Sequence, residues 1–274
     1  EDFVVTSKSK HIYILDKNGL KTDYDADKYL LGTPAIGNID NDSDLEIVFS
    51  GYSSGNKLFA INVDGTDVEG FPMELGEKVK IGVALADFNN NGKDDIVVGT
   101  DDDHIYLIYD DASIAPGFPF VTGDKVQSAP AIIDTEFGKV IISGCNDDKV
   151  YVINEDGSLA FTIDASDKIL NSAAFLTINN EVYTFISDDA GILYAFDLDG
   201  NALSGWPVDA GAVISKSVVF SDLNNDGNIE IIAVTEMADV LVFNLDGSLY
   251  SGVPRDNEFT FTGSPLIHDL DGDG

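Results

Sequence analysis

The chain has 274 residues, of which 44% are hydrophobic and 23% are charged, a composition typical of a folded protein with a sizeable core. Aspartate and glutamate number 49 against 15 lysines and arginines, so the formal net charge is −34. This charge repels a polyanion, and no apolar run is long enough to span a bilayer, so we expect neither a nucleic-acid partner nor membrane insertion.

A short unit recurs about every 46 residues along the chain. An apolar strand that ends in a polar turn occurs six times, with turns at Asn18-Gly19, Asp64-Gly65, Asp110-Asp111, Asp156-Gly157, Asp199-Gly200 and Asp246-Gly247. The Asn-Gly and Asp-Gly pairs favour type I′ hairpins, in which both central residues have positive φ. The third turn has no glycine and therefore predicts a longer loop.

Each unit predicts four strands. Two short apolar runs precede every turn, and a run that contains proline follows four of them, as "EGFPM", "PGFPF", "SGWPV" and "SGVPR". Proline cannot donate to a sheet ladder, so these last strands should lie at sheet edges. No segment has a helical period. The pattern predicts an all-β fold, a six-bladed β-propeller of four-stranded antiparallel blades that forms one domain over residues 1–274.

The two ends of the sequence predict how the ring closes. The first unit lacks its first strand, and the last unit holds only a first strand, "GSPLIHDL". We therefore expect the N- and C-terminal strands to share one blade, which would leave no open sheet edge. The main alternative is a solenoid, which would need capping ends.

The loop between the first and second strands of several units carries oxygen-bearing side chains at alternate positions. Three loops hold four such residues each, with an acid at the ninth position: Asn38, Asp40, Asp42 and Glu46; Asp87, Asn89, Asn91 and Asp95; Asp222, Asn224, Asp226 and Glu230. A fourth set, Asp269, Asp271 and Asp273, ends with the sequence, and Asp2 is its candidate closing ligand. Glycine stands in the bend of two of the three full loops, at Gly92 and Gly227, with Ser43 in the other.

These loops have the composition of a calcium cage. Calcium takes roughly six to eight oxygen ligands, and a backbone carbonyl from Asp44, Lys93 or Asn228 would add to the side chains. No histidine or thiol takes part, which disfavours zinc and copper. The closing acid at position nine and the flanking strands distinguish the loops from an EF-hand. The alternative is that Asp, Asn and Gly are only turn formers.

Two further units act as an internal comparison, because "IIDTEFGKV" and "FLTINNEVY" occupy the same place without the cage. The fold therefore tolerates loops without a cage. Because the cage is retained in the other loops, we predict about four structural calcium sites.

The chain resembles the FG-GAP/VCBS-type β-propellers, the calcium-loop propellers also seen in integrin α-subunit heads. The resemblance rests on the pattern D-x-[DN]-x-[DN]-G-x-x-[DE] at Asp87 and Asp222, with looser versions at Asn38 and Asp269. It covers the whole chain and implies a repeat of large secreted or surface proteins of bacteria. The FG-GAP dipeptides themselves are hardly visible, two units lack the loop, and such families often have seven blades.

No arrangement of residues predicts catalysis or a cofactor other than calcium. His11 and His104 open equivalent strands as solvated entries, and the single cysteine, Cys145, reads as a buried strand residue. We expect a non-enzymatic, calcium-binding propeller that serves as a binding or structural module of a larger extracellular or cell-surface protein, with a protein or glycan ligand on one face. The alternatives are a lyase-like enzyme that acts on polysaccharides and a subunit of an extracellular filament or surface layer.

Overall fold

The computed structural model describes residues 2–53, 55–237, 239–250, 260–261 and 263–269. The described residues form 22 strands in six sheets and contain no helix. Neighbouring strands pair in antiparallel fashion, as in β1 with β2 and β8 with β9. The predicted all-β class is confirmed.

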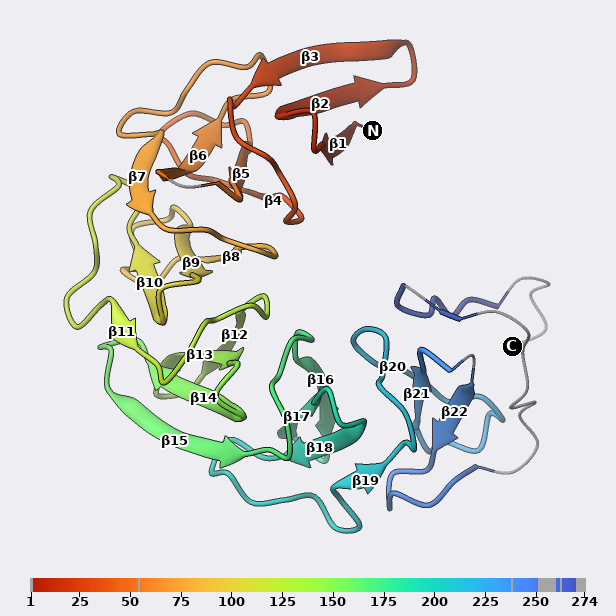
Figure 1. Ribbon diagram of the computed structural model, residues 1–274. Coiled ribbons are helices and arrows are strands. Elements are labelled where there is room, and N and C mark those ends of the chain that lie inside the picture. Colours follow the sequence, from red (N-terminus) through yellow and green to blue (C-terminus); the bar gives the residue numbers. More distant parts are fainter. Residues whose placement is uncertain (1, 54, 238, 251–259, 262, 270–274) are drawn as a thin grey trace. The chain divides into compact units, whose positions relative to one another are not determined.

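The sheets follow the order of the sequence, and consecutive strands are neighbours within each (Figure 1). The first sheet is β1 (Phe3–Thr6), β2 (His11–Asp16) and β3 (Gly19–Asp25). The second is β4 (Ala35–Gly37), β5 (Glu46–Ser50), β6 (Asn56–Ile61) and β7 (Met73–Gly76). The third is β8 (Ala84–Ala86), β9 (Asp95–Gly99), β10 (His104–Ile108) and β11 (Phe120–Val121).

The remaining sheets repeat this arrangement. The fourth is β12 (Ala131–Thr135), β13 (Gly138–Gly144), β14 (Lys149–Asn154) and β15 (Leu159–Asp164). The fifth is β16 (Ala174–Ile178), β17 (Glu181–Ser187), β18 (Ile192–Phe196) and β19 (Val208–Asp209). The sixth is β20 (Val219–Ser221), β21 (Glu230–Val234) and β22 (Val240–Phe243).

The chain divides into two compact units. The first comprises residues 1–147 and 151–160, and the second comprises residues 148–150 and 161–274. The first three sheets belong to the first unit and the last two sheets to the second, while strands of the fourth sheet belong to both. The single domain expected over residues 1–274 stays a prediction.

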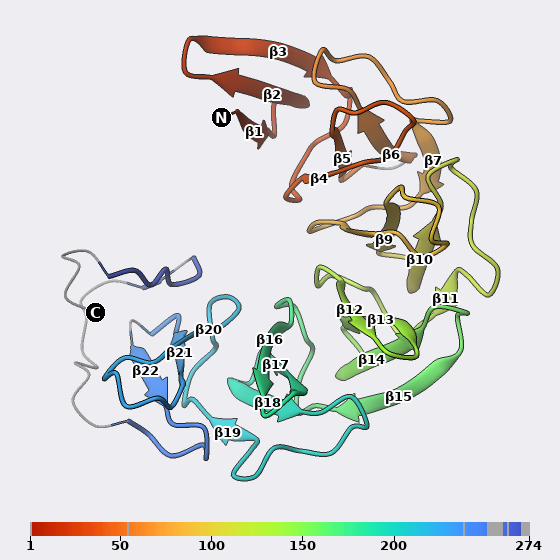
Figure 2. The same ribbon diagram turned by 180° about the vertical axis from the view of Figure 1, so that it is seen from behind.

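The core of the first unit lies between neighbouring sheets, which stand side by side in Figures 1 and 2. Alternate residues of β5 face opposite ways: Ile47 and Phe49 pack with Ile12 of the first sheet, and Val48 packs with Ile96 of the third. Both faces of β5 are thus covered, and all five of its residues are buried. This burial explains why Ile47, Val48 and Phe49 form a continuous apolar run.

Aromatic rings form much of the core of the second unit. Phe185 makes edge-on contacts with Trp206 and Phe220, with ring centroids 5.2 and 5.1 Å apart. The Trp206 indole N–H donates to the carbonyl of Leu245 at 2.9 Å. The only tryptophan of the chain is therefore a packing residue with its polar atom satisfied.

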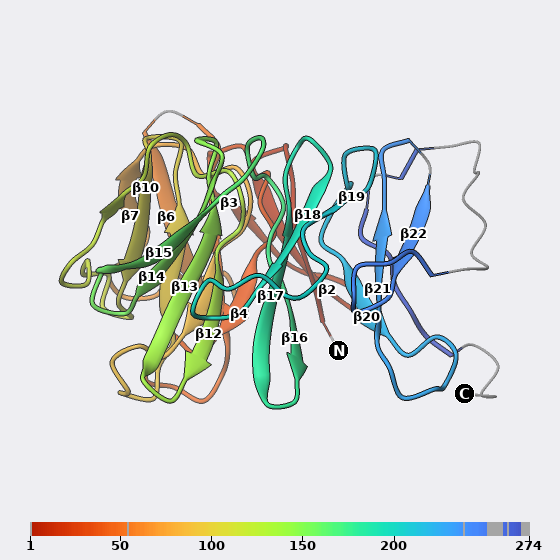
Figure 3. The same cartoon turned by 90° about the horizontal axis from the view of Figure 1, so that it is seen from below.

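The hairpin turns with Asp-Gly differ from the type I′ prediction. At Asp64-Gly65 only the glycine has positive φ (87°), and its N–H donates to the carbonyl of Asn62 at 2.9 Å. This is the three-residue hairpin loop, a turn followed by a left-handed glycine, so the type I′ prediction was wrong here. The positive φ at both central residues that defines type I′ occurs instead at Asn179 (51°) and Asn180 (68°), between β16 and β17 (Figure 3).

The turn at Asp110-Asp111 is not a longer loop. Ala112 takes the place of the missing glycine with φ of 62°, and its N–H donates to the carbonyl of Tyr109 at 2.9 Å, as Gly65 does in the preceding unit. The main chain therefore keeps the same turn, although a residue with a Cβ is strained in this conformation.

The proline-containing segments precede edge strands, as predicted. β7, β11 and β19 follow Pro72, Pro119 and Pro207, and each is the last strand in the order of its sheet. The fourth "SGVPR" segment lies in residues 251–255, outside the described part of the chain. The strand expected over residues 263–270 is described only for 263–269, which belong to no strand, and closure of the ring by the two termini stays a prediction.

Candidate metal centres

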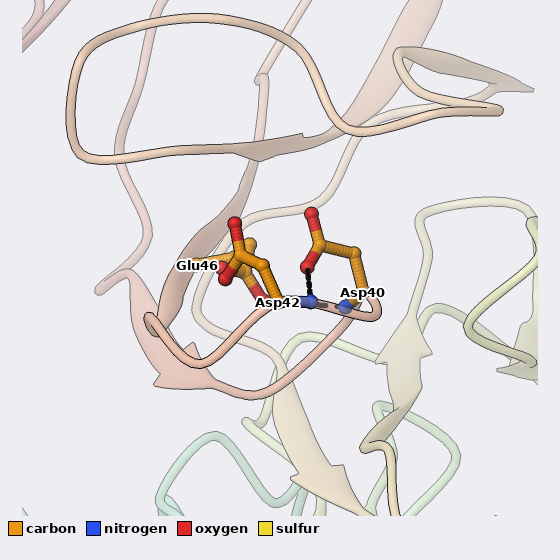
Figure 4. A group of neighbouring side chains, drawn as sticks. All are labelled: Asp40, Asp42 and Glu46. Carbon is orange, nitrogen blue, oxygen red and sulfur yellow. Dashed lines mark hydrogen bonds between the residues drawn. The ribbon is translucent and has the colours of Figure 1, made fainter.

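The loop 38–46 joins β4 to β5 and is shaped by its own side chains. The N–H of Asp42 donates to Asp40 Oδ1 at 2.8 Å, and the N–H of Asp44 donates to Asp42 Oδ1 at 2.7 Å. Glu46, at the start of β5, accepts the N–H of Ile39 on Oε2 at 2.7 Å. These bonds fold the loop so that Asp40, Asp42 and Glu46 lie near one another, as Figure 4 shows.

Two buried oxygens in this loop have no hydrogen-bond partner. Asp40, Asp42 and Glu46 each offer a carboxylate oxygen within 4.8 Å of the others. Glu46 is fully buried, and its Oε1 is unpartnered, as is the buried Oδ1 of Asn38. Burial, together with the charges of Asp40 and Asp42, raises the pKa of Glu46. An unpaired buried carboxylate is costly, and a hard cation would offset that cost, so these residues fit calcium.

The loop 87–95 joins β8 to β9 and has the same plan. Asp87 accepts the N–H of Asn91 at 3.1 Å and that of Gly92 at 2.8 Å. Gly92 has φ of 87°, which confirms the predicted need for glycine in the bend. Asp95 is fully buried and accepts the N–H of Phe88 at 2.9 Å. Burial raises the pKa of Asp95 to about 6.

Asp110, which was not among the predicted ligands, lies against this loop from the turn that follows β10. Its N–H donates to Asp95 Oδ1 at 3.0 Å, and its Oδ1 accepts from Asn91 Nδ2 at 2.8 Å. Its other oxygen forms an ion pair with Lys93. Burial alone would raise the pKa of Asp110, but the bonds to Lys93 and Asn91 lower it. The sequence did contain a signal for this residue, because the turn Asp110-Asp111 has two acids where each of the other turns has at most one.

The loop 222–230 joins β20 to β21 and repeats the arrangement. Asp222 accepts the N–H of Asp226 at 3.1 Å and that of Gly227 at 2.8 Å, and Gly227 has φ of 86°. The buried Glu230 accepts the N–H of Leu223 at 2.8 Å. In all three loops the acid at position nine thus anchors the second residue. The loop 38–46, with Ser43 in the bend, has no residue of positive φ.

The remaining predicted ligands occupy the same loops or lie elsewhere. Asn89 and Asn224 accept the N–H of the residue two positions on, at 3.1 and 2.9 Å. Lys93 and Asn228, predicted as carbonyl ligands with Asp44, donate their N–H groups to the side chain at position five at 2.8 Å.

The fourth predicted site is described only in part. Asp269 is exposed, and Asp271 and Asp273 lie outside the described residues. Asp2 forms an ion pair with Lys21 at 3.0 Å. The site therefore stays a prediction.

The fourth and fifth sheets show what replaces the cage. β12 and β13 are joined by a tight turn in which Thr135 pairs with Gly138, and Ile133 pairs with Val140 where Ala86 pairs with Asp95 in the third sheet. The buried acid is thus replaced by an apolar residue, and the ladder extends to the turn. In the fifth sheet the ladder between β16 and β17 likewise extends to the turn, which is Asn179-Asn180.

The loop-bearing side of the fourth sheet carries two adjoining depressions. Their volumes are about 250 and 310 Å³, and both are lined by Glu155 and Asp156. Phe137, in the turn between β12 and β13, lines one and is 90% exposed; Phe88 and Tyr109 line the other. Lys139 also lines the depression beside Phe137, and its ammonium group pairs with Asp134 at 3.7 Å. An exposed aromatic ring beside two carboxylates suits a basic, partly apolar ligand.

The cysteine is buried, as predicted. Cys145 follows β13, has no exposed surface and donates its thiol hydrogen to the carbonyl of Asp124 at 3.0 Å. Burial raises the pKa of its thiol to about 11, which makes it a poor nucleophile.

A protein-family comparison identifies one of the repeats. The family described as FG-GAP-like repeat matches residues 38–98. The match begins at Asn38, the first residue of one candidate cage, and ends within β9, whose first residue, Asp95, is the last acid of the next cage. This segment thus matches an FG-GAP-like repeat. The predicted resemblance is therefore confirmed for it, and no curated protein sequence matches the chain.

Solved structures with a similar fold are β-propeller proteins. BamB from Moraxella catarrhalis has a TM-score of 0.71 at 16% identity, over 96% of this chain and 72% of its own. BBS1N, in complex with ARL6DN, has 0.61 at 14% identity, over 91% and 75%. The V. cholerae biofilm matrix protein Bap1 has 0.60 at 15% identity, over 80% and 38%. The chain thus has the β-propeller fold of which the FG-GAP-like repeat is one part.

The part of the chain that the structure describes offers no helix of a length and apolarity that could cross a membrane.

Proposed function

We propose that this chain is a calcium-stabilised, non-enzymatic β-propeller that acts as a binding or structural module of a larger secreted or cell-surface protein. The loops 38–46, 87–95 and 222–230, with the partly described loop at Asp269, are the calcium sites. Six blades close into a ring through the terminal strands. The ions brace the loops and have no catalytic role.

The buried carboxylate of Glu46 carries this proposal. It lies in the FG-GAP-like repeat, has no exposed surface, has one oxygen without a partner, and stands within 4.8 Å of Asp40 and Asp42. A turn needs Asp and Asn to accept N–H groups, but it does not need three carboxylates around a buried, unpartnered oxygen. Calcium coordination accounts for this arrangement.

The proposed calcium sites and the proposed location are consistent with each other. Extracellular calcium modules bind with dissociation constants of roughly 10⁻⁴–10⁻³ M, which leaves them largely empty in a cytosol. At about 1 mM calcium, each site would add on the order of 1 kcal/mol to the free energy of unfolding. The biofilm matrix protein Bap1, which shares the fold, is in keeping with such a setting.

A protein partner is the ligand class we favour. One propeller of the same fold, BBS1N, was solved in complex with ARL6DN. In this chain the depressions around Glu155 and Asp156, with Phe137 beside them, offer an acidic and aromatic surface to a basic segment of a partner.

Thermal unfolding during calcium titration of chelated protein tests the proposal. We expect the melting temperature to rise and to saturate near millimolar calcium, with magnesium unable to reproduce the rise. Glu46→Gln should bind calcium more weakly, yet be at least as stable as the wild type in chelator, because it removes an unpaired buried charge. Glu155→Gln, at a carboxylate outside the cages, is the matched control and should leave the calcium response unchanged.

An unchanged melting temperature in calcium would refute the metal sites. A Glu46→Gln variant with the wild-type calcium response would show that the loop 38–46 is only a turn. Release of products from pectic or uronic polymers by the purified protein would refute the non-enzymatic proposal.

A further inference from the structure

The acids Asp94 and Asp95 are adjacent in sequence but contact different candidate cages. Asp95 is the first residue of β9, and Asp94 is the last residue of the loop before it. Asp95 points into its own loop, where it accepts the N–H of Phe88 at 2.9 Å. Asp94 points the other way and accepts the N–H of Asn38, the first ligand of the loop 38–46, on Oδ2 at 3.0 Å. The corresponding residues of the other two loops, Leu45 and Ile229, have no polar side-chain atom.

Three hydrogen bonds hold Asn38 to the loop 87–95. Besides the bond to Asp94 Oδ2, the carbonyl of Asn38 accepts the N–H of Asp94 at 2.6 Å. The side-chain Nδ2 of Asn38 donates to the carbonyl of Gly92 at 2.9 Å. All of these residues lie in the first compact unit. One loop thus fixes both the main chain and the side chain of a ligand in the other.

The bond to Gly92 also decides which end of the Asn38 side chain faces its own loop. A carbonyl oxygen can only accept, so the amide nitrogen must face Gly92 and Oδ1 is left free. That Oδ1 is the second of the two buried, unpartnered oxygens in the loop 38–46. Gly92 occupies the bend of the loop 87–95, and its N–H is held by Asp87 at 2.8 Å. The orientation of one calcium ligand therefore depends on the order of the neighbouring loop.

Gly37 leaves the space that this contact needs. A Cβ at this position would lie 2.5 Å from Asp94 Oδ2 and 2.8 Å from the Cδ1 of Leu85. A methyl group there would displace the Asp94 carboxylate from Asn38.

We propose that Asp94 is a positioning residue for the cage of the loop 38–46, so that the loops 38–46 and 87–95 bind calcium as a coupled pair. This inference rests on the proposed calcium function. An ion in the loop 87–95 fixes Gly92 and Asp94, so Asn38 loses less conformational freedom when its own loop binds. By reciprocity, an ion in the loop 38–46 strengthens binding in the loop 87–95 by the same factor.

A site-resolved calcium titration tests the coupling. Backbone amide signals of Asp42 and Gly92 in isotope-labelled, chelated protein report the two loops separately. Asp87→Asn removes the negative charge of one ligand of the loop 87–95, which weakens calcium binding there, and changes no residue of the loop 38–46. We expect it to weaken the response of Asp42 by about fivefold or more, the lower end of typical coupling. Asp222→Asn, the same change in the loop of the sixth sheet, is the matched control and should leave the Asp42 response unchanged.

Asp94→Ala keeps every predicted cage ligand and breaks the bridge. We expect a similar loss of affinity at Asp42, and no further loss when Asp87→Asn is added, because the two changes remove the same coupling. Gly37→Ala displaces Asp94 without changing it and should act in the same direction if Asp94→Ala does not fold.

An Asp42 response that is equal in the wild type, Asp87→Asn and Asp94→Ala would overturn the coupling while leaving the calcium sites intact. If neither amide of the wild type responds to calcium, the proposed function fails, and the coupling fails with it.

Discussion

The buried Asp95 predicts an unusual response of the calcium-free protein to acid. Its carboxylate has no exposed surface, and burial raises its pKa to about 6 from an ordinary value of 3.8. A raised carboxyl pKa means that the folded state binds a proton that the unfolded state does not, between pH 3.8 and about 6. Asp95 therefore makes the folded state more stable as the pH falls through this window, and less stable as the pH rises.

The size of the effect follows from the two pKa values. A difference of about two pH units corresponds to roughly 3 kcal/mol of free energy of unfolding between the ionised and the protonated carboxyl group. For a chain of this size this amounts to a shift in melting temperature on the order of 6–12 °C between pH 7.5 and pH 4. Relief of repulsion among other acids acts in the same direction, so the contribution of Asp95 must be isolated by a variant.

The assay is thermal unfolding in chelator across this pH range. Asp95→Asn should lose the part of the pH dependence that Asp95 supplies, whatever its absolute stability, since it has no carboxyl group to titrate. Asp111→Asn, at an exposed acid of the neighbouring turn, is the control and should follow the wild type. Calcium should abolish the gain in acid, because a ligating carboxylate stays ionised. If Asp95→Asn and the wild type have parallel pH profiles in chelator, the reasoning about this buried acid is wrong.

Three further predictions concern the loops and the core. Gly92→Ala should lower the free energy of unfolding, measured by urea unfolding, by about 1–2 kcal/mol, because φ is 87° at this position. The cost comes from the backbone alone, since nothing lies within 4 Å of the new Cβ. Ser43→Ala, where φ is not positive, is the control and should be near neutral. Trp206→Phe should cost about 1–3 kcal/mol in urea unfolding followed by circular dichroism, because the carbonyl of Leu245 loses its donor; a neutral result would show that this bond is dispensable. Cys145 should resist a thiol reagent at pH 8 in the native protein and react once urea unfolds it, because the native thiol is buried with a pKa of about 11; rapid native labelling would contradict this placement.

The spacing of residues along the chain was sufficient to predict the repeat, the strand order and the loops. A four-stranded unit uses about the same number of residues each time, so turns such as Asp64-Gly65 and Asp156-Gly157 show the period directly. The alternation in Asp87, Asn89 and Asn91 is equally local, because each side chain bonds to an N–H two to five residues away. Such contacts depend on neighbours in sequence and can be inferred without a fold.

Local reasoning failed where two conformations satisfy the same residues. Asp-Gly suits both a type I′ turn and a turn followed by a left-handed glycine, and the strand register decides between them. Ala112 shows that the register can impose a left-handed conformation without glycine. The ladder, which continues through the Asn179-Asn180 turn, sets the type I′ geometry there.

The sequence by itself determined the all-β class, the repeat and the positions of three oxygen-rich loops. Only the tertiary structure decided which oxygens those loops leave without a partner, because burial at Glu46 and the position of Asp110 depend on packing between distant segments. It also gave the adjacent acids Asp94 and Asp95 hydrogen-bond partners in two different loops. Adjacent acids look identical along a chain, and only the packing of the loop 38–46 against the residue before β9 gives them different partners.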